Sequence, residues 1–150
     1  MNLLFVCHGN ICRSPMAEFT MKHLVEQACL SHLFTIDSAA TSTEELGNPI
    51  YPQALRELAL HGITHAHHTA RQLSPDDYHR FDLILGMDTA NMRNMHRLLG
   101  SDPDGKLHRL LDFTFHPGDV DDPWYTRDFS KAWSDIHEGC QALLQHLTTL

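Results

Sequence analysis

The sequence predicts an α/β domain in which a small four-stranded parallel sheet carries helices on both faces, in the doubly wound arrangement. Four short apolar runs lack clean polar alternation, which is typical of parallel strands buried on both faces. Helical patterns lie between these runs, so strands and helices alternate along the chain. The 150 residues suffice for one domain with a substantial core, and no repeat or linker marks a second. We therefore expect a single domain spanning residues 1–150.

The predicted strands are the apolar runs themselves. They cover residues 3–6 (LLFV), 33–36 (LFTI), 81–85 (FDLIL) and 107–111 (LHRLL). In sheets of this kind, ligands bind beyond the carboxyl ends of the strands. The loop that follows the first strand is therefore the first place to look for a binding site.

The predicted helices show apolar residues at helical spacing. The first contains Ala17, Met21, Leu24, Val25 and Ala28; the second contains Leu55, Leu58 and Ala59 and ends at Gly62; the third contains Met92, Met95 and Leu99 and ends at Gly100; the last contains Trp133, Ile136, Cys140, Leu143, Leu144 and Leu147. Glycine is the residue most often found just beyond the end of a helix.

Composition and charge narrow the classes of function. The formal net charge of -8 argues against nucleic acid or an anionic membrane as a partner. No apolar run approaches the roughly 18 residues of a membrane span, and the N-terminus does not resemble a signal peptide. The four cysteines of so regular a chain are expected to be free thiols in a reducing compartment, which predicts a cytoplasmic protein.

The loop from Cys7 to Ser14 lies between the first strand and the first helix. Gly9 lets the backbone curl, and Asn10 tolerates a left-handed conformation. Ser14 followed by Pro15 is typical of a helix start, with the serine expected to cap the helix. The loop amides and the helix N-terminus would then favour negative charge at one point.

The same loop carries a nucleophile and an anion-binding group. A cysteine in such a field, here Cys7, is expected to be a thiolate. Arg13 lies six positions later, so in a closed loop its guanidinium returns over the same point. Its planar fork can hold two phosphate oxygens. Thiolate, amides and arginine together predict a phosphoryl-transfer site.

Residues 6–18, VCHGNICRSPMAE, resemble the signature loop of the low-molecular-weight protein tyrosine phosphatases, which share a Cys-x5-Arg-Ser phosphate loop. Residues 121–125, DDPWY, resemble the Asp-Pro-aromatic-Tyr loop of that family. Further matches are DSAATS (37–42), HHTARQL (67–73) and FDLILGMD (81–88). The resemblance therefore covers essentially the whole chain.

The resemblance implies a hydrolase that acts on phosphotyrosine and aryl phosphates through a cysteinyl-phosphate intermediate. Cys7 would attack phosphorus, and Arg13 would bind the phosphate and the transition state. Asp122 would protonate the leaving oxygen and then serve as base for water. Asp122 is preferred to Asp121 because it directly precedes Pro123, as in the family motif. No cofactor and no metal ion are implied.

The resemblance also assigns the binding residues. The phosphate loop comprises His8, Gly9, Asn10, Ile11, Cys12 and Ser14 in addition to Cys7 and Arg13. Trp124 and Tyr125 would wall an aryl slot, with Ile11 in its floor. Asn10, Ser14 and His68 would form a supporting network, in which Ser14 bonds to the Cys7 sulfur. Tyrosine-phosphorylated proteins or peptides are the expected partners of a monomer, and inorganic phosphate the product and inhibitor.

The cysteines outside the nucleophile have two possible roles. Cys12 either packs under the loop or, as in the family, traps oxidised Cys7 as a disulfide. Cys29 and Cys140 lie in helical patterns and are expected to be structural.

One segment departs from the family pattern. Glu44 and Glu45 stand where family members often carry an aromatic residue at the rim of the slot. The departure leaves the chemistry intact and affects the preference for substrates.

Two alternatives remain at this point. An arsenate reductase on the same fold would need relay cysteines, and residues 66–100 contain none. A metal-binding module could use His61, His65, His67 and His68, but their spacing matches no recognised ligand pattern.

Overall fold

The computed structural model describes residues 1–149, and within them it contains a four-stranded parallel sheet. The strands are β1 (Asn2–Cys7), β2 (Thr35–Ala40), β3 (Leu83–Gly86) and β4 (Leu107–Arg109), in the order β2-β1-β3-β4. The central β1 pairs in parallel with both β2 and β3, and β3 pairs with β4. The predicted α/β class is confirmed.

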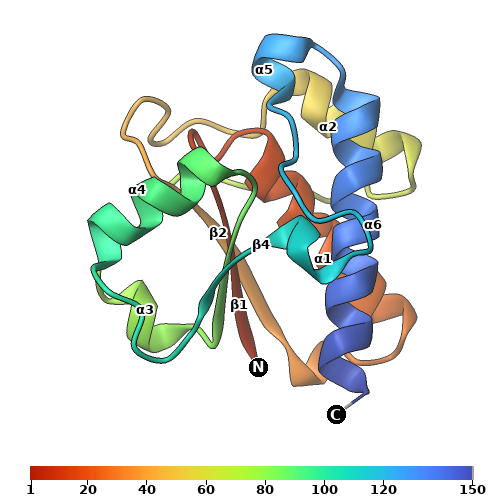
Figure 1. Cartoon of the computed structure of the whole chain (residues 1–150). Coiled ribbons are helices and arrows are strands. Elements are labelled where there is room, and N and C mark those ends of the chain that lie inside the picture. The colour runs from red at the N-terminus through yellow and green to blue at the C-terminus, as the bar shows by residue number, and fades with distance from the viewer. Residues whose placement is uncertain (150) are drawn as a thin grey trace.

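Helices cover both faces of this sheet (Figure 1). On one side lie α1 (Arg13–Gln27), α2 (Pro52–Leu60) and α6 (Phe129–Thr148); on the other lie α3 (Asp77–Arg80) and α4 (Thr89–Leu99). Short turns η1 (Ser31–Leu33), η2 (Leu110–Phe113) and α5 (Pro123–Thr126) complete the described chain. No helix among residues 1–149 has the length and apolar character that a membrane crossing requires.

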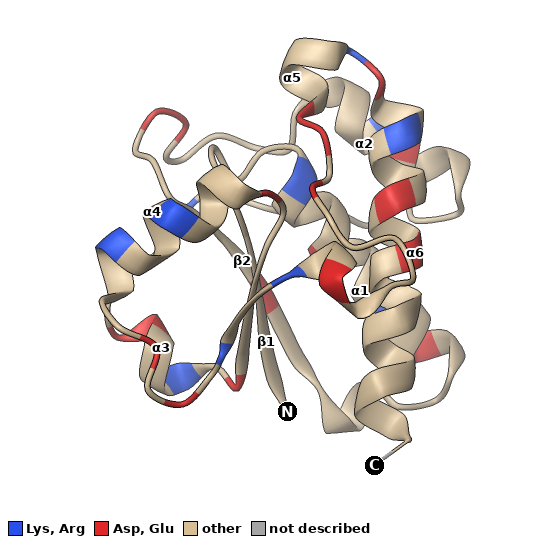
Figure 2. Ribbon diagram, viewed as in Figure 1, with Lys and Arg blue, Asp and Glu red and all other residues tan. Residues whose placement is uncertain are grey.

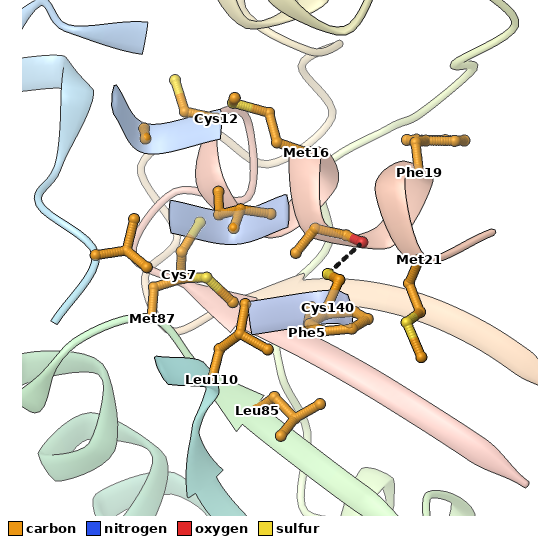
Figure 3. Close-up of a cluster of buried hydrophobic side chains, with 14 of the residues drawn as sticks. Phe5, Cys7, Cys12, Met16, Phe19, Met21, Leu85, Met87, Leu110 and Cys140 are labelled. Carbon is orange, nitrogen blue, oxygen red and sulfur yellow. Dashed lines mark hydrogen bonds between the residues drawn. The ribbon is translucent and has the colours of Figure 1, made fainter. Parts of the chain in front are cut away.

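Alternate residues of β1 pack into two separate hydrophobic clusters, one on each face of the sheet. Leu3 and Phe5 belong to the cluster under α1 and α6, whereas Leu4 and Val6 belong to the cluster under α3 and α4. Both faces of the strand are thus fully buried, as an uninterrupted apolar run predicts. Figure 3 shows the first of these clusters, including Phe5 and the bond between the Cys140 thiol and the Ala17 carbonyl at 3.7 Å.

The predicted boundaries of the second and fourth strands differ from the observed ones. The second strand is shifted toward the C-terminus and ends at Ala40, because its buried half is made of small residues instead of large apolar ones. The fourth strand ends at Arg109, and the apolar residues that follow it form η2.

Two sequence-based assignments at α1 are wrong. The helix begins at Arg13, and its N-cap position is Cys12 without a side-chain cap, so Ser14 is not the cap. The Ser14 hydroxyl instead bonds within the phosphate loop. Cys29 lies beyond the end of α1, exposed and with φ of 60°, so it is not a structural helix residue. Cys140, by contrast, is buried in α6 as predicted.

Candidate active site

The Cys7 sulfur lies at the carboxyl end of β1, where the chain turns through residues 8–12 into α1. The Ser14 hydroxyl oxygen lies 3.0 Å from Cys7 Sγ, and the Ser14 amide donates to the same sulfur at 3.4 Å. The loop therefore holds a buried sulfur against the hydroxyl and the amide of Ser14.

Asn10 holds the loop in this shape. It has φ of 58° and is fully buried, in the left-handed conformation that asparagine tolerates. Its Nδ2 donates to the hydroxyls of Ser14 at 2.7 Å and Ser38 at 2.9 Å. Because the Ser14 oxygen accepts this bond, its own hydrogen is free to point at Cys7. The bond from Asn10 thus sets the orientation of the Ser14 hydroxyl.

His68 and Glu18 close the network behind the loop. His68 Nε2 lies 2.7 Å from the carbonyl oxygen of Asn10 and donates to it. Ser38 Oγ donates to the buried Glu18 at 2.5 Å, and His68 Nδ1 lies 3.8 Å from the same carboxylate. Glu18 was not singled out in the sequence, although it ends the matched loop motif.

Arg13 is almost completely buried, at 2% exposure. Its Nη1 donates to Asp88 at 2.7 Å and to the carbonyl of Val120 at 2.8 Å. Its Nη2 lies 3.4 Å from an Asp122 carboxylate oxygen. Burial would lower the pKa of this guanidinium, but the negative charges of Cys7, Asp122 and Asp88 raise it above its ordinary value. The arginine is therefore a fixed cation beside the sulfur.

Asp88 is a site residue that sequence reasoning missed. It follows β3 and is the N-cap of α4, where it accepts from the Asn91 amide at 2.7 Å. Its other oxygen orients Arg13. The signal was its place at the end of a buried strand and before a helix, which is typical of both a cap and a site residue.

The two neighbouring aspartates have different surroundings. Asp122 is the N-cap of α5, with one carboxylate oxygen 3.0 Å from the Trp124 amide and the other facing Arg13. Asp121 instead faces Lys131, 3.7 Å away, and does not line the cavity. The structure therefore places Asp122, and not Asp121, opposite the nucleophile loop.

One cavity brings most of the predicted residues together. Its lining comprises Cys7, His8, Gly9, Ile11, Cys12, Arg13, Glu44, Glu45, Asp122, Trp124 and Tyr125. Asn10, Ser14 and His68 lie behind the loop and support it from there. At the rim, His8 Nε2 lies 2.9 Å from a carboxylate oxygen of Glu44. Figure 2 shows acidic residues at the tip of the segment that connects β2 to α2.

The surroundings of Cys12 disfavour its charged form. Burial, followed by the charges of Cys7 and Asp122, raises the pKa of the Cys12 thiol to about 12. At neutral pH it is therefore a protonated thiol lining the cavity.

Within residues 1–149, no cluster of three or more histidine, cysteine or acidic side chains could hold a metal ion. His61 instead stacks on Trp133, with the ring centroids 3.4 Å apart.

A cysteine and an arginine in one loop, with a carboxylate facing them at the carboxyl end of a parallel sheet, define a cysteine-dependent phosphatase. The family model of the low molecular weight phosphotyrosine protein phosphatases matches residues 2–149. The chain belongs to this family, and it is a hydrolase of phosphotyrosine.

Individual relatives support the assignment. The phosphatase of this family from Gallus gallus is 39% identical over 149 residues, which cover 96% of this chain and 94% of that protein. The crystal structure of YfkJ from Bacillus subtilis has a TM-score of 0.95 at 35% identity, covering 99% of this chain and 95% of that one. A Drosophila arginine phosphatase has a TM-score of 0.88 at 32% identity, covering 99% and 98%.

Proposed function

We propose that Cys7, Arg13 and Asp122 carry the hydrolysis of phosphotyrosine as nucleophile, phosphate ligand and general acid. One observation supports this proposal above the others: the three side chains line one cavity, in which Arg13 lies 3.4 Å from the Asp122 carboxylate and the charge of Cys7 raises the pKa of Arg13. We further propose that residues 1–150 form a single phosphatase domain.

The first half of the reaction transfers the phosphoryl group to sulfur. The Cys7 thiolate attacks phosphorus, forming an S–P bond while the bond from phosphorus to the tyrosyl oxygen breaks. Asp122 gives its proton to that oxygen, so that a neutral phenol leaves. Arg13 binds the phosphoryl oxygens, on which charge develops in the transition state. The hydroxyl of Ser14 stabilises the thiolate and the sulfur when it leaves again.

The second half restores the enzyme. Asp122, now a carboxylate, takes a proton from water as the water oxygen attacks phosphorus. The S–P bond breaks, inorganic phosphate leaves and the Cys7 thiolate is regenerated. Asp122 ends the cycle protonated, ready for the next leaving group. The reaction balances without a cofactor.

The walls of the cavity support an aryl substrate. Ile11 contributes an apolar floor, and Trp124 and Tyr125 stand at the mouth as exposed aromatic side chains. A tyrosine ring fits between such walls while its phosphate reaches the loop. We further propose that the chain acts as a monomer in the cytoplasm on tyrosine-phosphorylated proteins, with inorganic phosphate as product and inhibitor.

Steady-state hydrolysis of p-nitrophenyl phosphate and of a phosphotyrosine peptide tests the proposal. Wild type should hydrolyse both, and Cys7→Ser should hydrolyse neither while still binding inorganic phosphate, because Arg13 and the loop remain. A phosphoarginine peptide of the same sequence serves as the comparison substrate. Turnover by Cys7→Ser near the wild-type rate, or a higher kcat/KM for the phosphoarginine peptide, would contradict the proposal.

A further inference from the structure

Arg127 has a backbone conformation that arginine rarely adopts. It ends α5 with φ of 60° and ψ of 15°, in the left-handed region. Among residues 1–149, only Asn10 and Cys29 share a positive φ without being glycine. Glycine is the residue that fits this helix-end position without strain. A residue keeps such a conformation where the surrounding structure holds it, so the contacts of the Arg127 side chain matter.

The side chain of Arg127 lies among three aromatic rings. Its guanidinium carbon is 5.4 Å from the ring centroids of Tyr51 and Phe129 and 5.9 Å from that of Trp124. Its Nη2 donates to the Tyr51 hydroxyl at 2.9 Å. These distances suit cation–π attraction to each ring. The guanidinium thus joins residues from α5, from the start of α6 and from the segment before α2, which meet at one end of the molecule (Figure 1).

These contacts link the phosphate loop to the wall of the slot. The Tyr51 amide donates to the carbonyl of Ile11 at 2.9 Å, so Tyr51 is fixed to the floor. The Tyr51 ring meets Trp124 edge-on, with centroids 5.0 Å apart. Trp124 is 44% exposed and belongs to the four-residue turn α5. A single exposed turn would leave its indole free to change rotamer.

We propose that Arg127 is a positioning residue that locks Trp124 against Tyr51 and so keeps the aryl slot preformed. The guanidinium does not line the cavity. Its charge lowers the pKa of Cys12, but this influence ranks after burial and the charges of Cys7, Asp122 and Arg13. The guanidinium acts through the wall, on the part of the substrate that is not phosphate. The expected signature is therefore a loss of affinity for aryl phosphates without a loss of affinity for phosphate itself.

Arg127→Gly tests this role while keeping the backbone conformation favourable. The KM for p-nitrophenyl phosphate should rise about 2- to 5-fold, the factor that corresponds to one exposed cation–π contact. The inhibition constant of inorganic phosphate should not change. Arg127→Lys should recover part of the affinity, because it keeps the charge but not the planar fork. Arg97→Ala, which removes an exposed arginine of α4, is the matched control and should change neither constant.

A second readout follows the wall directly. In a Trp133→Phe background Trp124 is the only tryptophan, and Arg127→Gly should lower its fluorescence anisotropy. An unchanged KM for p-nitrophenyl phosphate, or an equal shift in KM and in the phosphate inhibition constant, would overturn the inference. The inference rests on the proposed function, and the wild-type enzyme tests that function separately. An inactive wild type that binds no phosphate contradicts the proposed active site. An active wild type with an unresponsive Arg127 variant contradicts only the role of Arg127.

Discussion

At the scale of single residues, the site depends on what each polar atom bonds to. The Ser14 hydroxyl accepts from Asn10 and is left with one hydrogen for Cys7. Arg13 is held by Asp88 and the Val120 carbonyl, which fixes the plane of its guanidinium. A preorganised cation of this kind stabilises developing charge without reorganisation during the reaction.

Arg13→Lys is predicted to lower kcat/KM for p-nitrophenyl phosphate by about 100-fold or more, the loss seen when one fixed donor to a transition state is removed. A lysine supplies the charge but cannot bond Asp88, Val120 and two phosphate oxygens with one ammonium group. Steady-state kinetics measure the loss, and Arg93→Lys on exposed α4 is the matched control. Activity within a few-fold of wild type would show that the fork geometry is unimportant.

Cys12 is predicted to protect Cys7 by forming a disulfide. As a thiol with a pKa of about 12 it is protonated at neutral pH, so it does not compete for the substrate. When Cys7 is oxidised to a neutral sulfenic acid, burial still raises the pKa of Cys12, but the smaller contribution of the Cys7 charge disappears. Cys12 can then attack, forming the S–S bond with release of water.

Brief treatment with peroxide should therefore inactivate the enzyme reversibly. Dithiothreitol should restore activity of wild type, and peptide mapping should find a Cys7–Cys12 bridge. Cys12→Ser should recover less activity after the same treatment, and Cys29→Ser, which removes an exposed thiol, should behave as wild type. Equal recovery of Cys12→Ser would leave Cys12 as a packing residue.

At the scale of elements, α5 and its N-cap supply three residues of the cavity lining. Its N-cap is Asp122, whose carboxylate caps the turn and faces Arg13, and the turn carries both aromatic residues of the slot. The proposed acid and the wall therefore depend on one turn. A substitution at Asp122 affects the cap as well as the proton, so the two effects need separate variants.

Asp122→Asn keeps a capping side chain but loses the proton, and Asp122→Ala loses both. Both are predicted to slow phosphoryl transfer most for leaving groups of high pKa, by about 100-fold or more for phenyl phosphate, because such groups need the proton. The loss should be smaller for p-nitrophenyl phosphate. A leaving-group series measured by stopped flow, with Asp121→Ala as the control, checks this. An equal loss across the series would indicate a purely structural role.

The sequence predicted the elements and most of the site, and its failures have physical causes. The phosphate loop was predictable because its motif is contiguous, within residues 7–14, and because Ser14 bonds to Cys7 and to Asn10 inside that segment. Asp88 was missed because its function depends on β3 lying beside β1, a neighbour relation that the sequence does not display. The end of β2 was missed because its buried residues are small: Ser38 is buried beside Glu18 of α1, and Ala39 is buried in the cluster under α3 and α4. Arg127 was missed because it acts through Tyr51, which lies 76 positions away.

At the scale of the whole molecule, anion binding opposes the overall field. The formal net charge is -8, and Glu44 and Glu45 add negative charge to the rim of the cavity. In the proposed function, the positive charge that binds phosphate is local and buried, in Arg13. We therefore expect the rim to act on the residues that flank the phosphotyrosine and not on the phosphate held inside.

Phosphopeptides with basic flanks are predicted to have a higher kcat/KM than peptides with acidic flanks. The difference should be a few-fold at most, because exposed ion pairs contribute little. It should diminish with salt, since the Debye length falls from about 10 Å at 0.1 M to about 3 Å at 1 M. Glu44→Gln with Glu45→Gln should abolish the preference and leave p-nitrophenyl phosphate hydrolysis nearly unchanged. Identical ratios in wild type and the double variant would mean that these residues only solvate a surface turn.

The central claim is that Cys7 carries the phosphoryl group, and rapid acid quench followed by peptide mass spectrometry tests it most directly. Wild type mixed with excess p-nitrophenyl phosphate should show one phosphoryl group on the peptide that contains Cys7. Asp122→Asn should retain this adduct longer, because the water then lacks its base. Cys7→Ser should show no rapidly formed and hydrolysed adduct. A phosphoryl group on His8, or rapid turnover with no phosphoryl-enzyme in any quenched sample, would contradict the account.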